Sequence, residues 1–259
     1  MNVLESFSLK GKTALVTGGA GLFGRQITEA LAEAGAQTFI ADCDMQKQET
    51  QIANYFRPQG LEIQALQYDQ GDERSIQALL QTLIDRAGGV DVLINNAVLR
   101  VMPGWGSPAE TFAKSMAVNA TGIFLMTRAF GDHMAARGHG SIVNVGSMQG
   151  MIGPDFNLYE GNGPRPAPDY FIHKGGVLQL TRYAAAQLGP RGVRVNTVCP
   201  GGFFNNQHPQ FLERYYKHTY LGRMANMTDL KGVMVFLASE ASAYVTGASI
   251  VVDGGYTVN

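Results

Sequence analysis

The sequence predicts an α/β protein built on a doubly wound parallel sheet of about seven strands flanked by helices. Short runs of β-branched and aliphatic residues alternate with segments of helical periodicity from one end of the chain to the other. A glycine-rich turn follows the first of these runs. Strands separated by helices pair in parallel through right-handed crossovers. The 259 residues, 45% of them hydrophobic, suit a single domain spanning 1–259.

The first half of the chain supplies four strands, and helices separate them. The first strand stops at glycines, and the helical periodicity that follows it ends at Gly35. Each later strand is a short apolar or β-branched run. The expected strands of this half cover 13–17, 38–41, 63–67 and 90–94. The expected helices cover about 22–35, 45–57 and 72–86.

The second half repeats this alternation with two interruptions. Its expected strands are 141–145, 193–198 and 249–252, and its expected helices are about 109–137, 170–188 and 227–238. The interruptions are a proline-rich loop at about 148–169 and an aromatic-rich segment at about 202–224. Long loops in compact domains are often functional. Because both follow strands, at the sheet edge where ligands bind, we expect both to flank a substrate.

Composition excludes several classes of partner. The net charge is −1 and the isoelectric point about 6.5, with no long basic stripe, so neither nucleic acid nor membrane is an expected partner. No apolar run approaches the roughly 18 residues of a membrane span, and the N-terminus has no apolar signal core. We therefore expect a cytoplasmic protein. Cys43 and Cys199 lack metal-ligand spacing, so no metal is expected.

A glycine turn near the N-terminus predicts a dinucleotide site. Gly18, Gly21 and Gly24 stand between the first strand and the first helix, where a backbone without side chains can approach a pyrophosphate. Asp42 stands at the end of the next strand, where its carboxylate would bind the ribose hydroxyls and repel a 2′-phosphate. Cys43, not a cation, follows it. The pattern favours NAD over NADP, although Asp42 at a helix N-cap is the alternative.

Tyr170 and Lys174 form the most informative pair. Their i, i+4 spacing places the phenol and the ammonium on one helix face, where the ammonium favours the phenolate. Such a tyrosine can exchange a proton with an alcohol or ketone while a nicotinamide exchanges the hydride. Ser147, at the end of a strand, can orient the same oxygen. A pair of this kind on a solvated helix face is the alternative interpretation.

Over essentially its whole length the chain resembles the short-chain dehydrogenase/reductase family, whose members have a single-domain Rossmann-type fold. The motifs that carry this resemblance are Asn95-Asn96-Ala97-Val98, Val118-Asn119-Ala120-Thr121-Gly122, Pro200-Gly201 and Val252-Asp253-Gly254-Gly255, together with Asp69, Ser147, Tyr170 and Lys174.

The resemblance implies a role for each matching residue, and it also implies a homotetramer. The implied catalytic residues are Asn119, Ser147, Tyr170 and Lys174. The implied cofactor-binding residues are Gly18, Gly21, Leu22, Phe23, Gly24, Asp42, Asp69, Gln70, Asn96, Ala97, Val98, Tyr170, Lys174, Pro200 and Gly201. Leu22 and Val98 depart from the family pattern, since each stands where glycine is usual. No threonine closely follows Pro200-Gly201, so Asn205 or Asn206 could replace it at the carboxamide.

A finer resemblance links the chain to bacterial surface-sugar and flagellin-modification oxidoreductases, through 153–161, 200–207 and 221–224. It implies hydride transfer between NAD(H) and a sugar or nucleotide-sugar-like substrate. The expected substrate contacts are Arg165, Phe203, Phe204, Asn205 and Arg214, because arginines suit phosphate and aromatic faces suit sugars. A reductase of 3-oxoacyl thioesters, a small polyol dehydrogenase and a non-catalytic cofactor-binding regulator are the alternatives.

Overall fold

Parallel strands form a single sheet in the computed structural model, which describes residues 2–161 and 165–258. The strands are β1 Thr13–Thr17, β2 Gln37–Asp42, β3 Ile63–Gln67, β4 Val92–Asn95, β5 Gly140–Val145, β6 Val193–Pro200 and β7 Ser249–Val252. Their order in the sheet is β3-β2-β1-β4-β5-β6-β7, with every neighbouring pair parallel. The predicted fold class is confirmed. The order reverses between β1 and β4, which is where such sheets open a ligand crevice.

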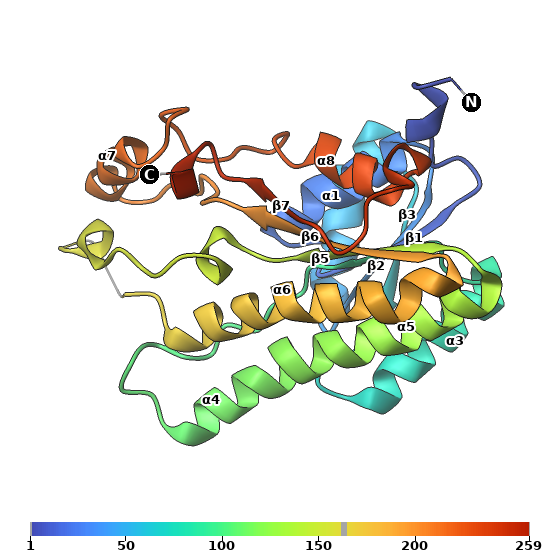
Figure 1. The fold of residues 1–259 in the computed structure, drawn as a ribbon, viewed down its shortest axis with the longest axis horizontal. Coiled ribbons are helices and arrows are strands. Elements are labelled where there is room, and N and C mark those ends of the chain that lie inside the picture. Colours follow the sequence, from blue (N-terminus) through green and yellow to red (C-terminus); the bar gives the residue numbers. More distant parts are fainter. Residues whose placement is uncertain (1, 162–164, 259) are drawn as a thin grey trace.

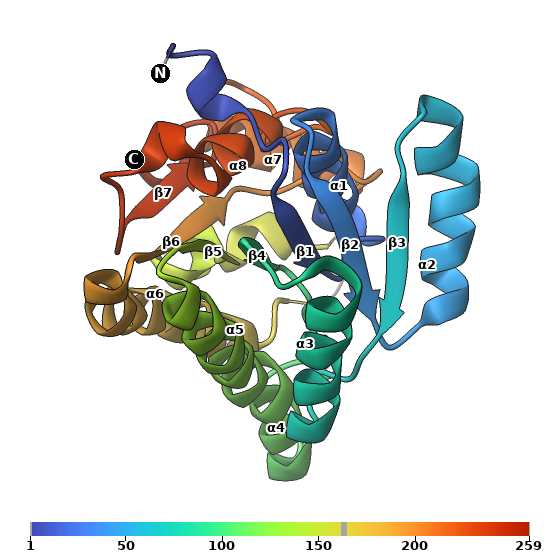
Figure 2. The same ribbon diagram turned by 90° about the vertical axis from the view of Figure 1, so that its right-hand side faces the viewer.

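Helices cover both faces of the sheet (Figures 1 and 2). They are α1 Leu22–Glu33, α2 Met45–Gln51, α3 Glu73–Ala87, α4 Ala109–Met116, α5 Ile123–Arg137, α6 Pro168–Leu188, α7 Pro209–Lys217 and α8 Lys231–Ala238. Figure 2 shows α3, α5 and α6 beneath the sheet, with α1 and α8 on the opposite face. No helix in the described part of the chain is both long enough and apolar enough to cross a membrane.

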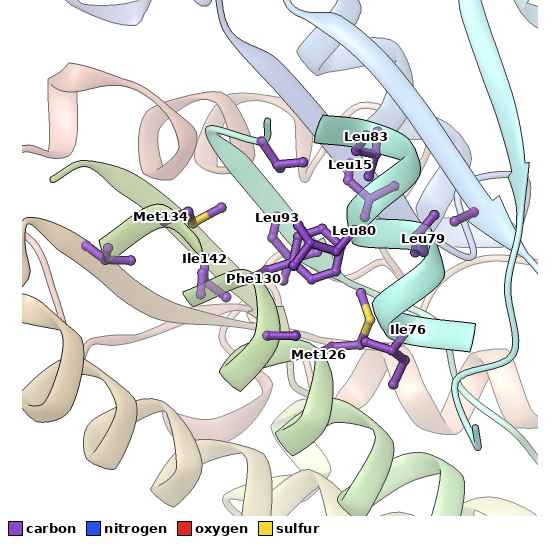
Figure 3. Close-up of a cluster of buried hydrophobic side chains, with 14 of the residues drawn as sticks. Leu15, Ile76, Leu79, Leu80, Leu83, Leu93, Met126, Phe130, Met134 and Ile142 are labelled. Carbon is purple, nitrogen blue, oxygen red and sulfur yellow. The ribbon is translucent and has the colours of Figure 1, made fainter. Parts of the chain in front are cut away.

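Two apolar clusters, one on each face, hold these layers together. On the face of α3 and α5, Leu15 and Leu93 of the sheet meet Leu80 and Phe130 of the helices (Figure 3). Phe130 is completely buried. The second cluster joins α1 and α8 to the other side of β1, β2 and β4. Because both faces of each central strand are buried, the strands read in the sequence as continuous apolar runs.

The predicted helix over 109–137 has the expected bounds, but it is not α-helical throughout. The structure has α4, then a π-helical segment Ala117–Gly122, then α5. Gly122 packs so closely on the chain at Gln70 that a Cβ there would lie 2.4 Å from the Gln70 carbonyl oxygen. Gln70 Nε2 also donates to the carbonyl of Val118 at 2.9 Å. Both are tertiary contacts, which helical periodicity does not reveal. The π-helical segment carries Asn119, as such insertions often carry functional residues.

The aromatic-rich segment 202–224 contains a helix, α7, that the sequence analysis did not predict. Figure 1 shows α7 above residues 148–161 of the predicted loop, at the end of the molecule where α6 begins. Tyr215 of α7 packs with Met148 and Leu158 of that loop in a small apolar cluster. Arg214 Nη1 donates to the carbonyls of Asn157 and Glu160, each at 2.7 Å. The two segments therefore lie against each other over one end of the sheet.

Candidate active site

A cleft of about 790 Å³ opens at the carboxyl ends of the strands. Most of the residues that the sequence implicated line it. Those residues are Gly18, Gly21, Leu22, Phe23, Asp42, Asp69, Gln70, Asn96, Ala97, Val98, Ser147, Tyr170, Lys174, Pro200, Gly201, Phe203 and Asn205. They come from segments far apart in the chain, and the parallel sheet brings them to a single edge.

The glycine turn between β1 and α1 fits a pyrophosphate. Gly18 has a φ of 62°, in the left-handed region that favours glycine. The helix α1 begins after Gly21 without a side-chain cap, so its first amide N–H groups remain available to an anion. Gly24 lies behind the turn rather than in the cleft, because a Cβ there would be 2.0 Å from the Gly18 carbonyl oxygen. Asn96 braces the turn through its Nδ2, which donates to the carbonyls of Thr17 and Gly18 at 2.9 and 3.1 Å.

Asp42 reaches the cleft at the end of β2, where an adenosine ribose would lie. Its Oδ1 accepts weak hydrogen bonds from the Cys43 thiol at 3.4 Å and from the Asp44 amide at 3.3 Å. Asp44, not Asp42, caps α2, by accepting from the Lys47 amide at 2.9 Å. Lys47 also lines this part of the cleft, and the sequence analysis did not identify it. The ribose end thus presents a carboxylate with an ammonium near it.

Ser147, Tyr170 and Lys174 all line the cleft. Tyr170 and Lys174 come from the first turns of α6, and the Lys174 Nζ is 5.7 Å from the centroid of the Tyr170 ring. Lys174 is 3% exposed and donates to the Val145 carbonyl at 2.6 Å. Burial, and secondarily the charge of Arg100, lowers the pKa of Lys174 to about 8. Its ammonium is therefore the main form at neutral pH and is held next to the phenol.

Asn119 does not line the cleft. It is fully buried, and its amide clamps the backbone of Leu99: Nδ2 donates to the Leu99 carbonyl at 2.7 Å, and Oδ1 accepts from the Leu99 amide at 2.8 Å. The segment after β4 carries Val98 and Arg100 into the cleft on either side of this clamp. Asn119 therefore fixes the wall that faces Tyr170.

A buried polar network connects Asn119 to the start of α6. Ser115 Oγ accepts from Asn119 Nδ2 at 3.1 Å and donates a very short hydrogen bond to the carboxylate of Asp169. Asp169 directly precedes Tyr170, and all three network residues are at most 4% exposed. The sequence analysis did not single out Ser115 or Asp169, because neither belongs to a recognisable motif.

Ser115→Ala is expected to destabilise the protein by roughly 1.5–3 kcal/mol, the range for hydrogen bonds to charged groups, because the buried Asp169 carboxylate loses its donor. The free energy of urea unfolding measures this loss. Thr111→Ala, a partly buried position on the same helix, is the control and should cost less. Equal unfolding free energies for wild type and Ser115→Ala would contradict this account of the network.

Arg100 is the main residue that the sequence analysis missed. It lines the cleft, and its guanidinium carbon lies 4.6 Å from the centroid of the Tyr170 ring. His173 meets the same ring edge-on, with centroids 5.2 Å apart. Burial, followed by the charges of Lys174 and Arg100, lowers the pKa of His173 to about 3, so its imidazole stays neutral.

The structure does not bring Arg165, Phe204 or Arg214 to the lining of the cleft. Arg165 stacks on Phe156, with its guanidinium carbon 4.9 Å from the ring centroid. Arg214 donates its hydrogen bonds to the carbonyls of Asn157 and Glu160. Phe203 and Asn205 do line the cleft, and Phe203 packs edge-to-face on Phe23 at 5.2 Å. Within the described residues, no group of three or more His, Cys, Asp or Glu side chains could hold a metal ion.

Comparison with known proteins reveals close relatives. A family model described as enoyl-(acyl carrier protein) reductase matches residues 20–257. The galactitol 2-dehydrogenase (L-tagatose-forming) of Cereibacter sphaeroides is 35% identical over 100% of both chains. A gluconate 5-dehydrogenase from Burkholderia cenocepacia J2315, solved with NADP and tartrate, is 32% identical over 100% of both chains, with a TM-score of 0.88. A short-chain dehydrogenase from Leptospira borgpetersenii with bound NAD⁺ is 30% identical over 98% of this chain and 95% of that chain, with a TM-score of 0.86.

Proposed function

Since the chain belongs to the short-chain dehydrogenase/reductase family, we propose that it transfers a hydride between NAD(H) and a hydroxyl or carbonyl group of a sugar or nucleotide-sugar-like substrate. The observation that carries the proposal is that Ser147, Tyr170 and Lys174 line the same cleft as the glycine turn and Asp42. Enzymes of this family are oxidoreductases that act on CH–OH and C=O groups.

Each of these side chains has a distinct role in the proposed reaction. A bound nicotinamide cofactor supplies or accepts the hydride. The Tyr170 phenol donates a proton to the reacting oxygen during reduction, and the Tyr170 phenolate accepts a proton from that oxygen during oxidation. The buried Lys174 ammonium stabilises the phenolate that forms. Ser147 Oγ, positioned by the hydrogen bond that it accepts from the Gln149 amide at 3.1 Å, orients the same oxygen.

The cofactor proposed is NAD. The backbone of 18–24 would hold the pyrophosphate, and Asp42 the adenosine ribose. The related structures include one complex with NADP and one with NAD⁺, so the carboxylate of Asp42 is the observation that favours NAD here. The Asp42 carboxylate would repel the 2′-phosphate of NADP, whereas the Lys47 ammonium would attract that phosphate.

Asp42→Asn is expected to lower kcat/KM for NAD by about 10-fold or more, because a charged hydrogen-bond acceptor is lost, and to raise kcat/KM for NADP. Steady-state kinetics with both cofactors measure the change. Asp44→Asn, which alters the cap of α2 outside the cleft, is the charge-matched control. A wild-type preference for NADP, or an unchanged cofactor ratio in Asp42→Asn, would argue against this choice.

The names of the relatives favour a polyhydroxylated substrate. The galactitol and gluconate enzymes support a sugar or a small polyol over a 3-oxoacyl thioester, which only the description of the family model suggests. A polyol dehydrogenase is therefore the second candidate function. We also propose a cytoplasmic homotetramer whose subunits meet through α4, α5 and α6. Phe124 and Tyr183, exposed on α5 and α6, support that contact.

The experiment that tests this function is cofactor-linked turnover across sugars, nucleotide sugars, polyols and oxoacyl thioesters, with NAD and NADP in separate assays. The proposal expects turnover with NAD and a sugar-like substrate. Turnover of a thioester alone would overturn the substrate class, and turnover only with NADP would overturn the cofactor.

A further inference from the structure

Arg100 places a positive charge in the cleft next to Tyr170, and the proposed reaction does not use this charge. It follows β4 on the segment that Asn119 clamps, so its backbone is held by a buried side chain. Its guanidinium lies over the ring of Tyr170, 4.6 Å from the centroid, and it lines the cleft. The side chain itself is exposed to solvent within that cleft. A permanent positive charge thus stands beside the proposed acid/base group, where a substrate must bind.

The contact with Tyr170 leaves the N–H donors of Arg100 available to an anion. A guanidinium over an aromatic ring is held by a cation–π contact, which uses none of its hydrogen bonds to an anion. The Tyr170 ring therefore holds the side chain in place without using its hydrogen bonds. An arginine already ordered in this way loses less conformational entropy when it binds a carboxylate through two parallel hydrogen bonds.

The carboxylates that line the cleft are confined to one part of it. Asp42 and Asp69 are the only carboxylates in its described lining, and both stand at or just beyond the ends of β2 and β3. Tyr170 and Ser147 instead share their part of the cleft with Arg100 and Lys174. Lys174 already donates to the Val145 carbonyl. Arg100 has no carboxylate partner among the residues that line the cleft, so a substrate must supply one if its charge is to be matched.

Resting on the proposed function, we propose that Arg100 binds the carboxylate of the substrate, which makes the substrate a sugar acid. The position of Arg100 over the Tyr170 ring requires the anionic group to lie within a few atoms of the reacting carbon. A carboxylate matches a single guanidinium in charge and in planar two-oxygen geometry. This assigns to Arg100 the recognition that the sequence suggested for Arg165 and Arg214, which are engaged outside the cleft.

The electrostatic effect of Arg100 on Lys174 also supports an acidic substrate. Arg100 contributes to lowering the pKa of Lys174, although burial is the larger cause. A carboxylate bound to Arg100 would offset this repulsion and favour the ammonium of Lys174. An acidic substrate would therefore strengthen the group that stabilises the phenolate of Tyr170, and a neutral polyol would not.

The test compares substrates that differ only in the anionic group. D-Gluconate is paired with D-glucitol and D-galactonate with galactitol, and glucitol 6-phosphate serves as a phosphate control. The cofactor-saturated wild type is expected to have the higher kcat/KM for each acid. Arg100→Gln should lower the ratio of acid to polyol kcat/KM by about 10- to 100-fold, mainly through KM, since a charged hydrogen bond is lost. Arg57→Gln removes an exposed arginine outside the cleft and should keep the ratio.

Several results would overturn the proposal. If Arg100→Gln lowered kcat/KM equally for acid and polyol, Arg100 would act only through Tyr170. If the wild type preferred glucitol 6-phosphate to the acids, the anion that Arg100 binds would be a phosphate and not a carboxylate. Preference of the wild type for neutral polyols would refute the proposal while leaving the proposed function intact. If no sugar were turned over, the proposed function would fail, and calorimetric binding of D-gluconate to the cofactor-bound protein would then decide. Loss of that binding in Arg100→Gln would support the proposal, and equal or absent binding in both proteins would refute it.

Discussion

Tyr170→Phe is expected to lower kcat by about 10²–10⁴-fold, the range that a positioned acid/base group contributes. Phenylalanine keeps the ring that contacts Arg100 and His173 and removes only the hydroxyl. The variant should therefore fold as the wild type does and still bind the cofactor, while the proton transfer fails. Single-turnover kinetics with saturating cofactor and substrate measure the chemical step directly.

Two controls accompany the Tyr170→Phe measurement. Titration of NADH should give a similar dissociation constant for variant and wild type, and thermal unfolding should give a similar midpoint. Tyr159→Phe is a matched substitution, because Tyr159 also lines the cleft but does not belong to α6. If Tyr170→Phe kept most of its turnover, Tyr170 would not be the acid/base group.

Lys174→Met is expected to lower kcat by about 10²–10³-fold, because removing one preorganised charged donor costs that much in comparable sites. Methionine has a similar length and no charge. Without the ammonium, the phenolate of Tyr170 loses its nearest buried cation, which lies 5.7 Å from the ring centroid. The measurement is kcat with the best substrate, and Lys114→Met, a cleft-lining lysine of α4, is the comparison. Equal effects of the two substitutions would contradict a specific role for Lys174.

Lys174→Met should also change how the stability of the protein depends on pH. Burial lowers the pKa of Lys174 from 10.5 to about 8, so holding its charge at neutral pH costs the folded state about 3 kcal/mol. This cost is fully present below pH 8 and disappears as the pH rises toward 10.5, because the folded protein binds fewer protons in that window. Methionine removes the cost but leaves the Val145 carbonyl without its donor, at about 1–3 kcal/mol.

Lys174→Met should therefore unfold at a urea concentration close to that of the wild type at pH 7, despite losing a buried side chain. At about pH 9.5 the wild type should have gained stability relative to the variant. Urea unfolding at both pH values measures this difference. A large loss of stability at pH 7, or the same pH dependence in both proteins, would contradict the assignment of a buried charged lysine.

Much of the fold could be predicted because its signals are local. The strands are short, buried on both faces and apolar, so β1, β3 and β7 have the predicted bounds and the others differ by a few residues. The π-helical segment at 117–122 could not be predicted, because it depends on how Gly122 packs against Gln70. The helix α7 was not predicted, because the aromatic residues of 202–224 were interpreted as substrate contacts and not as the apolar face of a helix. Pro209 at its start is nevertheless a typical helix signal.

The candidate site was predictable where spacing carries the information. The i, i+4 pair of Tyr170 and Lys174 lines the cleft, and so do Gly18 and Gly21 of the glycine turn. Arg100 belongs to no motif, and its position over Tyr170 depends on the loop that Asn119 clamps. The expectation for Arg214 followed from its chemistry alone. In the structure its donors are used by backbone carbonyls, which no sequence pattern reveals.

The most direct test of the central claim is hydride transfer with a labelled substrate. A sugar-like alcohol that the protein turns over would carry deuterium at the reacting carbon, and mass spectrometry would follow the label into the reduced cofactor. The account expects one deuterium in NADH for each turnover, and no transfer in Tyr170→Phe. A protein that binds NAD but transfers no label from any substrate class would contradict it and favour a non-catalytic regulator.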